Sequence, residues 1–250
     1  MTLRFLSRPG KHVFGPVPSR RLGKSLGVDL IPPKTCSLDC VYCQLPRTSA
    51  HTVERGSFVD WRAVVNEVRQ VLASGQEVDA ITISGSGEPT LNQDIGRVLQ
   101  ALGELTSATR VVITNGTLLH REDVRRDLAH ADLVMPSLDA VSPRAFATVN
   151  RPAPHLSLEQ HLSGLRRFAT DTKARLWLEI LLVQGLNDSE EDLQAFLAYL
   201  VGFPAERIQL NTVVRTPVET SIARATSPET MAHFRQELSK IHPFVEIIGT

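Results

Sequence analysis

Three cysteines, Cys36, Cys40 and Cys43, are the only cysteines of this 250-residue chain, and all of them lie within eight positions. Thiols that served only to fill a core would be scattered along the sequence. Three thiolates on one short loop can bind three irons of a cubane iron–sulfur cluster, which leaves the fourth iron open to another ligand. The spacing therefore predicts a metal centre with one free coordination position.

The spacing alone leaves other interpretations open. A disulfide framework needs an even number of cysteines and an oxidising compartment. A structural zinc ion takes four ligands, and neither His12 nor His51, the nearest histidines, stands at zinc-motif spacing. Packing of free thiols is the remaining alternative. The spacing favours an iron–sulfur cluster, and other parts of the sequence must separate it from zinc.

Composition places the chain among ordinary globular proteins, with 42% hydrophobic and 22% charged residues. The length allows one sizeable core. The formal net charge is zero, which excludes a general electrostatic attraction to nucleic acid. The sequence has neither an apolar run long enough to cross a membrane nor a signal peptide. We therefore expect a cytoplasmic protein that does not contact the membrane.

Hydrophobic periodicity predicts six strands, each followed by a helix. The strands are expected over 25–31, 78–84, 110–114, 132–138, 175–183 and 207–212. The helices are expected over 60–75, 92–105, 121–130, 157–170, 189–200 and 228–241, and a last short strand over 244–248. Pro16 and Pro18 forbid a helix near the N-terminus, so residues 1–25 are predicted to form an extension without a regular element.

Strands that alternate with helices imply a parallel sheet with right-handed crossovers. We predict an α/β fold, a partial (βα)6 TIM-type barrel with its active face at the C-termini of the strands, and a doubly wound sheet is the alternative. The chain is expected to form one domain over 1–250, with an extension (1–25), a barrel core (26–215) and a C-terminal helix and strand (216–250).

Unusual polar and glycine-containing groups follow each predicted strand. They are Cys36–Cys43, Gly87-Glu88-Pro89, Thr114-Asn115-Gly116, Ser137–Asp139, Gly185–Asp188 and Asn211-Thr212. The carboxyl ends of parallel strands meet at one face of a barrel. The six groups are therefore expected to form one site.

The cysteine spacing followed by Ser86-Gly87-Glu88-Pro89 resembles the radical S-adenosylmethionine (radical SAM) enzymes. The resemblance spans roughly residues 26–215 as an ordered series of motifs. It implies a [4Fe-4S] cluster and S-adenosylmethionine (SAM) as cofactors. In that family an electron from the cluster cleaves SAM, and the resulting 5′-deoxyadenosyl radical abstracts hydrogen from the substrate.

The resemblance implies roles for the matching residues of the first two strands. The three cysteines would ligate the cluster. The backbone of Tyr42 would meet the adenine of SAM. Ser86, Gly87 and Glu88 match a glycine-glycine-glutamate motif that would hold the methionine amino group, and Ser86 is a departure from the first glycine.

Residues of the next two strands also match the family. Thr114 and Asn115 occupy a position near cofactor or substrate. Ser137 and Asp139 resemble the motif that meets the ribose or the carboxylate of SAM. These four residues are therefore predicted to bind the cofactor.

A finer resemblance lies in residues 15–23 and 30–35, which look like the branch of radical SAM enzymes related to wyosine tRNA-base synthases. The tRNA enzymes of that branch carry additional cysteines for a second cluster, and this chain has none. The resemblance therefore implies radical chemistry with a single cluster on an unidentified substrate, either an RNA base or a small molecule.

Substrate contacts are predicted from three charged residues. Arg20 and Arg21, expected beside the barrel mouth, offer guanidinium groups for a phosphate or carboxylate. Glu179 points inward if its neighbours Leu178 and Ile180 point outward. Its carboxylate would then accept a proton or pair with an arginine.

Two alternative functions remain at this point. One is an activating enzyme for a glycyl-radical enzyme, and the other is a non-catalytic zinc or iron–sulfur binding module. The motif Gly87-Glu88-Pro89 favours an enzyme, because a structural metal site has no use for a carboxylate that binds an amine. An enzyme of this kind needs a flavodoxin- or ferredoxin-type electron donor as its partner.

Overall fold

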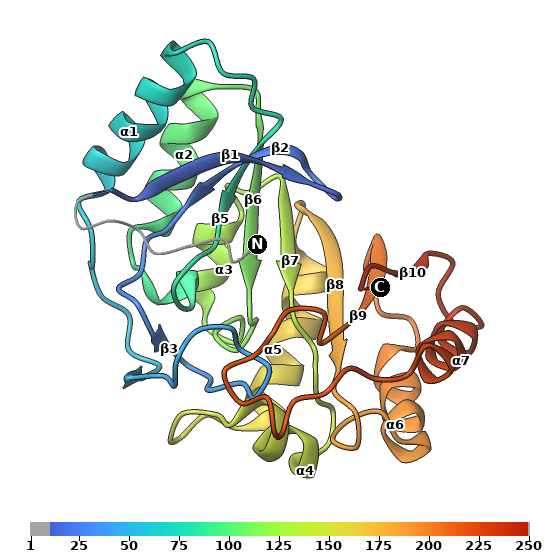
Figure 1. Cartoon of the computed structure of the whole chain (residues 1–250). Helices are drawn as coiled ribbons and strands as arrows, with labels where there is room; N and C mark the ends of the chain where they lie inside the picture. Colours follow the sequence, from blue (N-terminus) through green and yellow to red (C-terminus); the bar gives the residue numbers. More distant parts are fainter. Residues whose placement is uncertain (1–10, 250) are drawn as a thin grey trace.

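The computed structural model describes residues 11–249, and a curved sheet of eight strands forms its centre (Figure 1). In spatial order the strands are β1 (Val13–Ser19), β2 (Gly23–Val28), β5 (Ala80–Ile83), β6 (Thr109–Thr114), β7 (Leu133–Pro136), β8 (Arg175–Leu182), β9 (Arg207–Thr212) and β10 (Val245–Ile247). From β2 to β10 all neighbouring strands are parallel, and β1 is antiparallel to β2. The outermost strands β1 and β10 do not pair, so the predicted partial barrel is confirmed as an open one.

Helices connect the parallel strands and cover the outside of the curve (Figure 1). They are α1 (Trp61–Ala73), η1 (Pro89–Leu91), α2 (Ile95–Leu105), α3 (Glu122–Leu128), α4 (Pro143–Ala145), η2 (Phe146–Asn150), α5 (Leu158–Asp171), α6 (Glu190–Leu200) and α7 (Pro228–Leu238). Asp60 caps α1 through its side chain, and Ser157 and Ser189 form capping boxes. The six predicted strand–helix units are all present.

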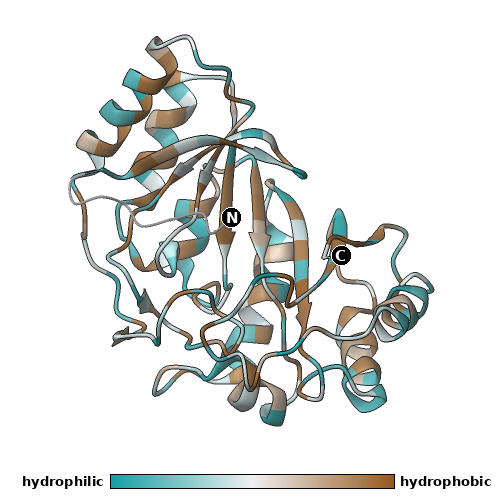
Figure 2. Cartoon of the chain, in the orientation of Figure 1, coloured by the Kyte–Doolittle hydropathy of each residue, from teal (hydrophilic) through white to brown (hydrophobic). Residues whose placement is uncertain are grey.

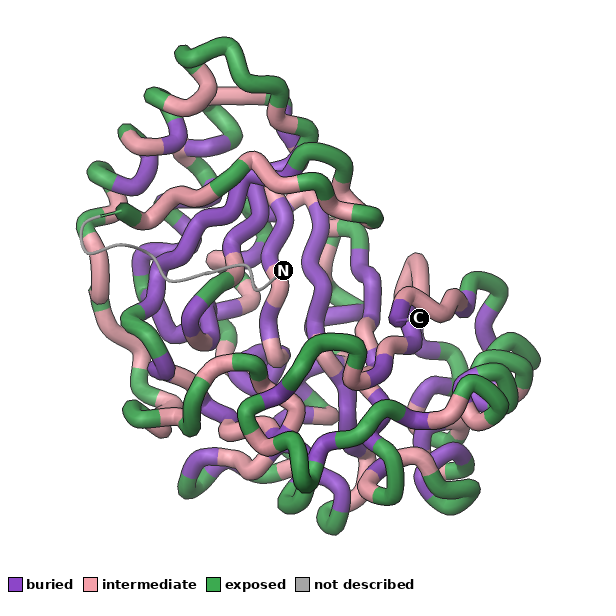
Figure 3. Tube along the Cα trace, viewed as in Figure 1, coloured by how far each residue is buried: buried purple, intermediate pink, exposed green. Residues whose placement is uncertain are grey.

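The main core lies between the sheet and these helices. Ile81, Leu178 and Leu99 are fully buried there together with Phe168 and Phe196. Hydrophobic colouring is frequent along the central strands, most of whose residues are buried, whereas β1 is partly exposed (Figures 2 and 3). Burying this apolar surface fixes which face of each strand points inward.

The N-terminal segment differs from the prediction. Residues 13–28 form a hairpin of β1 and β2, whereas no regular element was expected before residue 25. Pro16 and Pro18 exclude a helix, but an edge strand tolerates proline because one side of its backbone is unpaired. Leu22, in the turn, packs on an apolar layer of the inner sheet face. The hairpin therefore closes that end of the open barrel.

Residues 1–10 of the predicted extension lie outside the described part.

Arg55 ties the loop after β5 to α3. Its side chain is 7% exposed and bonds Asp123 Oδ2 at 2.8 Å and Asp127 Oδ2 at 2.6 Å. The same guanidinium donates to the carbonyl oxygens of Thr90 at 2.9 Å and Asn92 at 3.1 Å. One buried cation thus satisfies two carboxylates and two backbone groups.

Arg55→Met is expected to lower the free energy of unfolding by about 3–5 kcal/mol, because it leaves the partly buried carboxylate of Asp127 without a cation and two backbone carbonyl groups without a donor, while Asp123 keeps Arg121. Urea denaturation measures the loss. The exposed Arg126, also near α3, is the matched control, and Arg126→Met should change stability by less than about 0.5 kcal/mol. Equal effects of the two substitutions would contradict this account of Arg55.

Within residues 11–249, no helix combines the length and the apolar character that a membrane span requires.

Candidate functional site

The cysteine loop lies at the C-terminal edge of the sheet and is held by backbone hydrogen bonds from three sides. At its base, β3 (Thr35–Cys36) pairs with β4 (Ala50–His51). The amide of Lys34 donates to Ser86 O at 2.7 Å, which joins the loop to the segment after β5. On the other side, the amide of Val41 donates to Val149 O at 2.9 Å, in η2. The loop is therefore anchored before a ligand binds.

The three thiols are half-buried and unpaired, and each has a nitrogen donor beside it. Asn115 Nδ2 lies 3.6 Å from Cys36 Sγ, and Asn150 Nδ2 lies 3.6 Å from Cys40 Sγ. Burial raises the pKa of Cys36 to about 12 and that of Cys40 well above its usual value. The thiolate forms therefore require the positive charge of a bound metal.

A single-ion site is not preformed at the loop. His51 lies opposite Cys36 in the β3–β4 pair. Even so, no three His, Cys, Asp or Glu side chains within residues 11–249 are arranged around one metal ion. Three thiols without a fourth protein ligand fit a cubane with an open iron better than a closed tetrahedral zinc site.

The loop after β5 lies against the cysteine loop. The amide of Glu88 donates to Thr35 O at 3.0 Å. A Cβ on Gly87 would lie 2.0 Å from the same carbonyl oxygen and 2.7 Å from Ile31 Cγ2. Only glycine permits this approach. The two motifs that the sequence links are therefore in direct backbone contact.

Ser86 has a structural partner that accounts for its departure from glycine. Asp29 Oδ2, at the end of β2, accepts from Ser86 N at 3.0 Å and from Ser86 Oγ at 2.5 Å. Burial raises the pKa of Asp29, and these hydrogen bonds oppose the rise. The serine hydroxyl thus fixes the loop to β2.

Glu88 presents a buried carboxylate, with 2% of the residue exposed. Its Oε1 accepts from Thr90 N at 3.0 Å, Thr90 Oγ1 at 2.5 Å and Thr114 Oγ1 at 2.6 Å. Among the described residues, its Oε2 accepts from Asn115 N alone, at 2.7 Å. Burial raises the pKa of Glu88, and the hydrogen bonds oppose the rise. Oε2 retains capacity for one more donor, which suits an ammonium group.

Asp139 is placed at the site but is already engaged. Oδ1 accepts from Leu181 N at 3.1 Å, and Oδ2 accepts from the Tyr42 hydroxyl and from Asn150 Nδ2 at 3.0 Å. Burial raises the pKa of Asp139 to about 6. Through these hydrogen bonds, Asp139 holds the side chains of Tyr42 and Asn150 beside Cys40. Ser137, two residues earlier, is half-buried at the end of β7.

The two arginines predicted to bind substrate have different surroundings, and their role stays a prediction. Arg20 and Arg21 lie in the β1–β2 turn, at the N-terminal end of β2, opposite the cysteine loop (Figure 1). Arg20 is exposed, with no ion pair to any residue of 11–249. Arg21 Nη1 bonds Glu179 Oε2 at 2.6 Å and Gln209 Oε1 at 2.8 Å. Glu179 thus has the arginine partner that was considered for it, and the pair crosses the barrel interior.

Sequence patterns missed several residues that shape the site. Lys34 contacts Cys43, Asn150 contacts Cys40, and Asp29 supports the loop after β5. Asn150 ends a single π-helical turn far along the chain, where no periodicity marks it. Lys34 could have been found from the sequence, because a lysine two residues before Cys36 is close to the cysteine loop.

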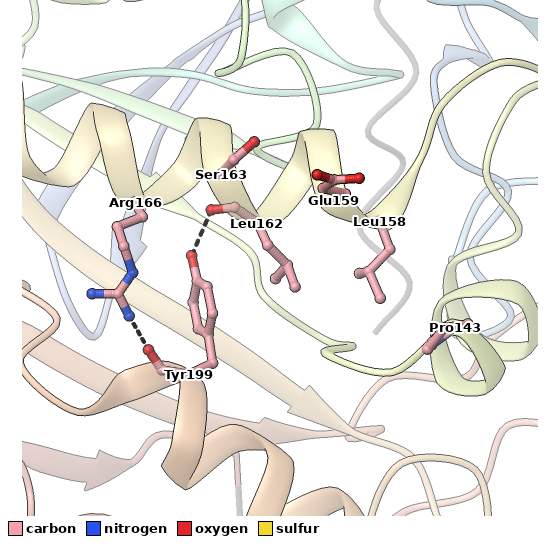
Figure 4. Close-up of a pocket in the computed structure, with 7 residues that line it drawn as sticks. All are labelled: Pro143, Leu158, Glu159, Leu162, Ser163, Arg166 and Tyr199. Atoms are coloured by element: carbon pink, nitrogen blue, oxygen red, sulfur yellow. Dashed lines mark hydrogen bonds between the residues drawn. The ribbon is translucent and has the colours of Figure 1, made fainter.

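A shallow apolar groove of about 480 Å³ lies elsewhere, between α5 and the end of α6 (Figure 4). In it, the Tyr199 hydroxyl donates to Leu162 O at 2.8 Å, and Arg166 donates to the carbonyl oxygen of Tyr199. None of the residues predicted to act in catalysis or binding lines this groove.

Gly87→Ala is expected to destabilise the protein by about 1–3 kcal/mol and to loosen the cysteine loop, because the new methyl group must displace the Thr35 carbonyl. Thermal unfolding and iron retention measure the two effects. A Cβ on Gly56 would make only ordinary contacts, 3.4 Å from Phe58, so Gly56→Ala is the control. Normal stability and iron retention in Gly87→Ala would argue against a tight contact.

Asp139→Asn is expected to change how stability depends on pH. The folded-state pKa of about 6 exceeds the unfolded value of about 3.9, so wild type gains stability as pH falls from about 6 towards 4. The variant lacks this gain. The free energy of unfolding, wild type minus variant, should be larger at pH 5 than at pH 7 in urea titrations of the metal-free protein. A difference independent of pH would refute the assignment.

Comparison with known proteins identifies the family of the chain. The sequence model of the radical SAM superfamily matches residues 30–197. A UPF0026 protein of Synechocystis is 37% identical over 81% of this chain and 76% of its own length. A UPF0026 protein of Methanocaldococcus jannaschii is 36% identical over 84% of this chain and 65% of its own length. A Brachyspira hyodysenteriae protein named GTPase Obg is 37% identical over 88% of this chain, which spans only 32% of that relative.

Solved structures share the fold. A radical SAM methyltransferase from Sphaerobacter thermophilus superposes with a TM-score of 0.65 at 20% identity, over 90% of this chain and 66% of its own. TYW1 with a lysine-pyruvate adduct bound gives a TM-score of 0.64 at 16% identity, over 86% and 73%. The family predicted from the cysteine spacing and Ser86–Pro89 is thereby confirmed: the chain belongs to the radical SAM superfamily.

Proposed function

We propose that the chain binds a [4Fe-4S] cluster through Cys36, Cys40 and Cys43 and uses it to cleave SAM reductively. The observation that carries this proposal is the backbone contact between the cysteine loop and Gly87-Glu88. It holds the buried carboxylate of Glu88 beside three thiols, which no fourth protein ligand joins among residues 11–249. When bound, the cluster supplies the electron that breaks a carbon–sulfur bond of SAM.

The residues around the loop divide the work of cofactor binding. Glu88 Oε2 offers its free acceptor capacity to the SAM amino group. Thr114 and the amide of Asn115 hold that carboxylate in place through 2.6 Å and 2.7 Å hydrogen bonds. Tyr42, fixed through its hydroxyl to Asp139, leaves its backbone at the edge of the loop for the adenine.

For the substrate we favour a molecule that contains a nucleobase, an RNA base or a small nucleotide. Relatives at lower identity include a GTP 3′,8-cyclase of Mannheimia succiniciproducens, 24% identical over 63% of this chain, and the dual-specificity RNA methyltransferase RlmN of Syntrophotalea carbinolica, 27% identical over 80%.

The rim of the site carries positive charge that would suit such a substrate. Arg47 and Arg215 are exposed beside the cysteine loop. Arg47 Nη2 pairs with Glu219 Oε1 at 3.3 Å, and Arg215 Nη1 lies 3.4 Å from Gln44 Oε1. Guanidinium groups bind phosphate well. A flavodoxin- or ferredoxin-type protein is the electron donor that this chemistry requires.

Anaerobic reconstitution with iron and sulfide tests the proposal. We expect a brown protein that forms 5′-deoxyadenosine from SAM when dithionite is added. Cys40→Ala should lose the cluster while its circular dichroism spectrum keeps the helical signal, because Cys40 is not part of the main core. Glu88→Gln should keep the cluster and bind SAM at least tenfold more weakly, since the carboxylate charge that faces the amine is removed.

Other outcomes would favour the alternatives. A colourless protein with stoichiometric zinc, or a full cluster in Cys40→Ala, would refute the proposed cofactor site. A cluster that binds SAM but never yields 5′-deoxyadenosine would favour a non-catalytic module. Formation of a glycyl radical on an added partner enzyme would show that the substrate is a protein and that the chain is an activating enzyme.

A further inference from the structure

Each cysteine sulfur is accompanied by a nitrogen donor from a different segment. Asn115 follows β6, Asn150 ends η2, and Lys34 precedes β3. Their side-chain nitrogens lie 3.6, 3.6 and 3.5 Å from the sulfurs of Cys36, Cys40 and Cys43 respectively. These separations are within the range of hydrogen bonds to sulfur. The donors therefore surround the sulfur ligands on three sides.

Lys34 is the only charged member of this set. It is 8% exposed, and no carboxylate of residues 11–249 lies within ion-pair distance of its ammonium group, although its charge acts on the more distant Asp39. Its amide donates to Ser86 O at 2.7 Å, and its carbonyl accepts from Ala50 N at 3.0 Å. Hydrogen bonds to two neighbouring segments thus hold the backbone of Lys34. From this position its side chain reaches Cys43 Sγ, 3.5 Å from the ammonium nitrogen.

The backbone of Lys34 is also strained. Its φ is +60°, in the left-handed region that glycine adopts most easily. A lysine there costs about 1 kcal/mol or more relative to glycine. Strain of this kind is tolerated where a side chain has a task that offsets it.

We infer that Lys34 is a positioning residue that raises the reduction potential of the cluster, with Asn115 and Asn150 as weaker, neutral contributors. This inference rests on the proposed cluster site. Reduction adds one negative charge to the cluster. A nearby ammonium group that is largely shielded from solvent stabilises the more negative, reduced state. Hydrogen bonds to cysteine sulfur act in the same direction, and such contacts are known to set iron–sulfur potentials.

The asparagines link this effect to the rest of the site. Asn115 offers its side chain to Cys36 and its amide to Glu88. Asn150 is held by Asp139, which also holds Tyr42. Substituting either asparagine would therefore disturb cofactor contacts, whereas Lys34 has no other side-chain hydrogen bond among the described residues. Lys34 is the cleaner position to change.

The test is an anaerobic redox titration of the reconstituted full chain, followed by electron paramagnetic resonance of the reduced cluster. At the potential that half-reduces wild type, Lys34→Met should show a reduced-to-oxidised ratio at least tenfold lower, a shift of about 59 mV to more negative potential. Lys34→Arg should keep most of the wild-type ratio. Lys173→Met removes an exposed lysine of the α5–β8 connection and should leave the ratio unchanged.

A second variant guards against misfolding. Lys34→Gly removes the amine and relieves the positive φ, so the metal-free protein should unfold at the same or higher temperature than wild type while the potential still falls. Equal potentials for wild type, Lys34→Met and Lys34→Gly, each with a full cluster, would overturn the inference. A wild-type protein that takes up no cluster would instead refute the proposed function, together with everything that rests on it.

Discussion

The contact between Gly87 and the carbonyl of Thr35 is the constraint on which the site depends. It joins the loop after β2 to the loop after β5, and it leaves no room for a side chain. The hydrogen bonds Glu88 N to Thr35 O and Lys34 N to Ser86 O lie on either side of it. Both loops begin at adjacent parallel strands, so the sheet sets the distance between their first residues. The absence of a side chain at Gly87 then allows the two loops to come into backbone contact.

Three buried carboxylates extend this arrangement along the edge of the sheet. Asp29 follows β2, Glu88 follows β5 and Asp139 follows β7. Burial raises the pKa of each, and each accepts at least three hydrogen bonds. An ionised carboxylate without such partners would be costly there. Each carboxylate therefore holds its own segment of the loops, and together the three position amides and sulfurs without a cofactor.

The opposite end of the barrel is closed in a different way. The β1–β2 turn places Leu22 on the apolar inner layer, and Arg21 reaches Glu179 and Gln209 above it. An open sheet leaves its inner face exposed unless another segment covers it. Here the N-terminal hairpin provides that cover, so the cysteine edge remains the accessible one.

The sequence by itself determined the alternation of strands and helices and the order of the motifs, because periodicity and spacing are local properties. Ligation of a cluster by the three cysteines stays a prediction. The sequence also predicted that polar groups would gather at the strand ends. It failed at the N-terminal hairpin, since an edge strand with prolines has no distinct pattern.

Only the tertiary structure decided which residues face the sulfurs. Asn150 reaches Cys40 across 110 positions, and Arg21 reaches Glu179 across 158. Such contacts arise from the curvature of the sheet and from where each loop leaves it. The spacing of residues along the chain therefore does not predict these long-range contacts.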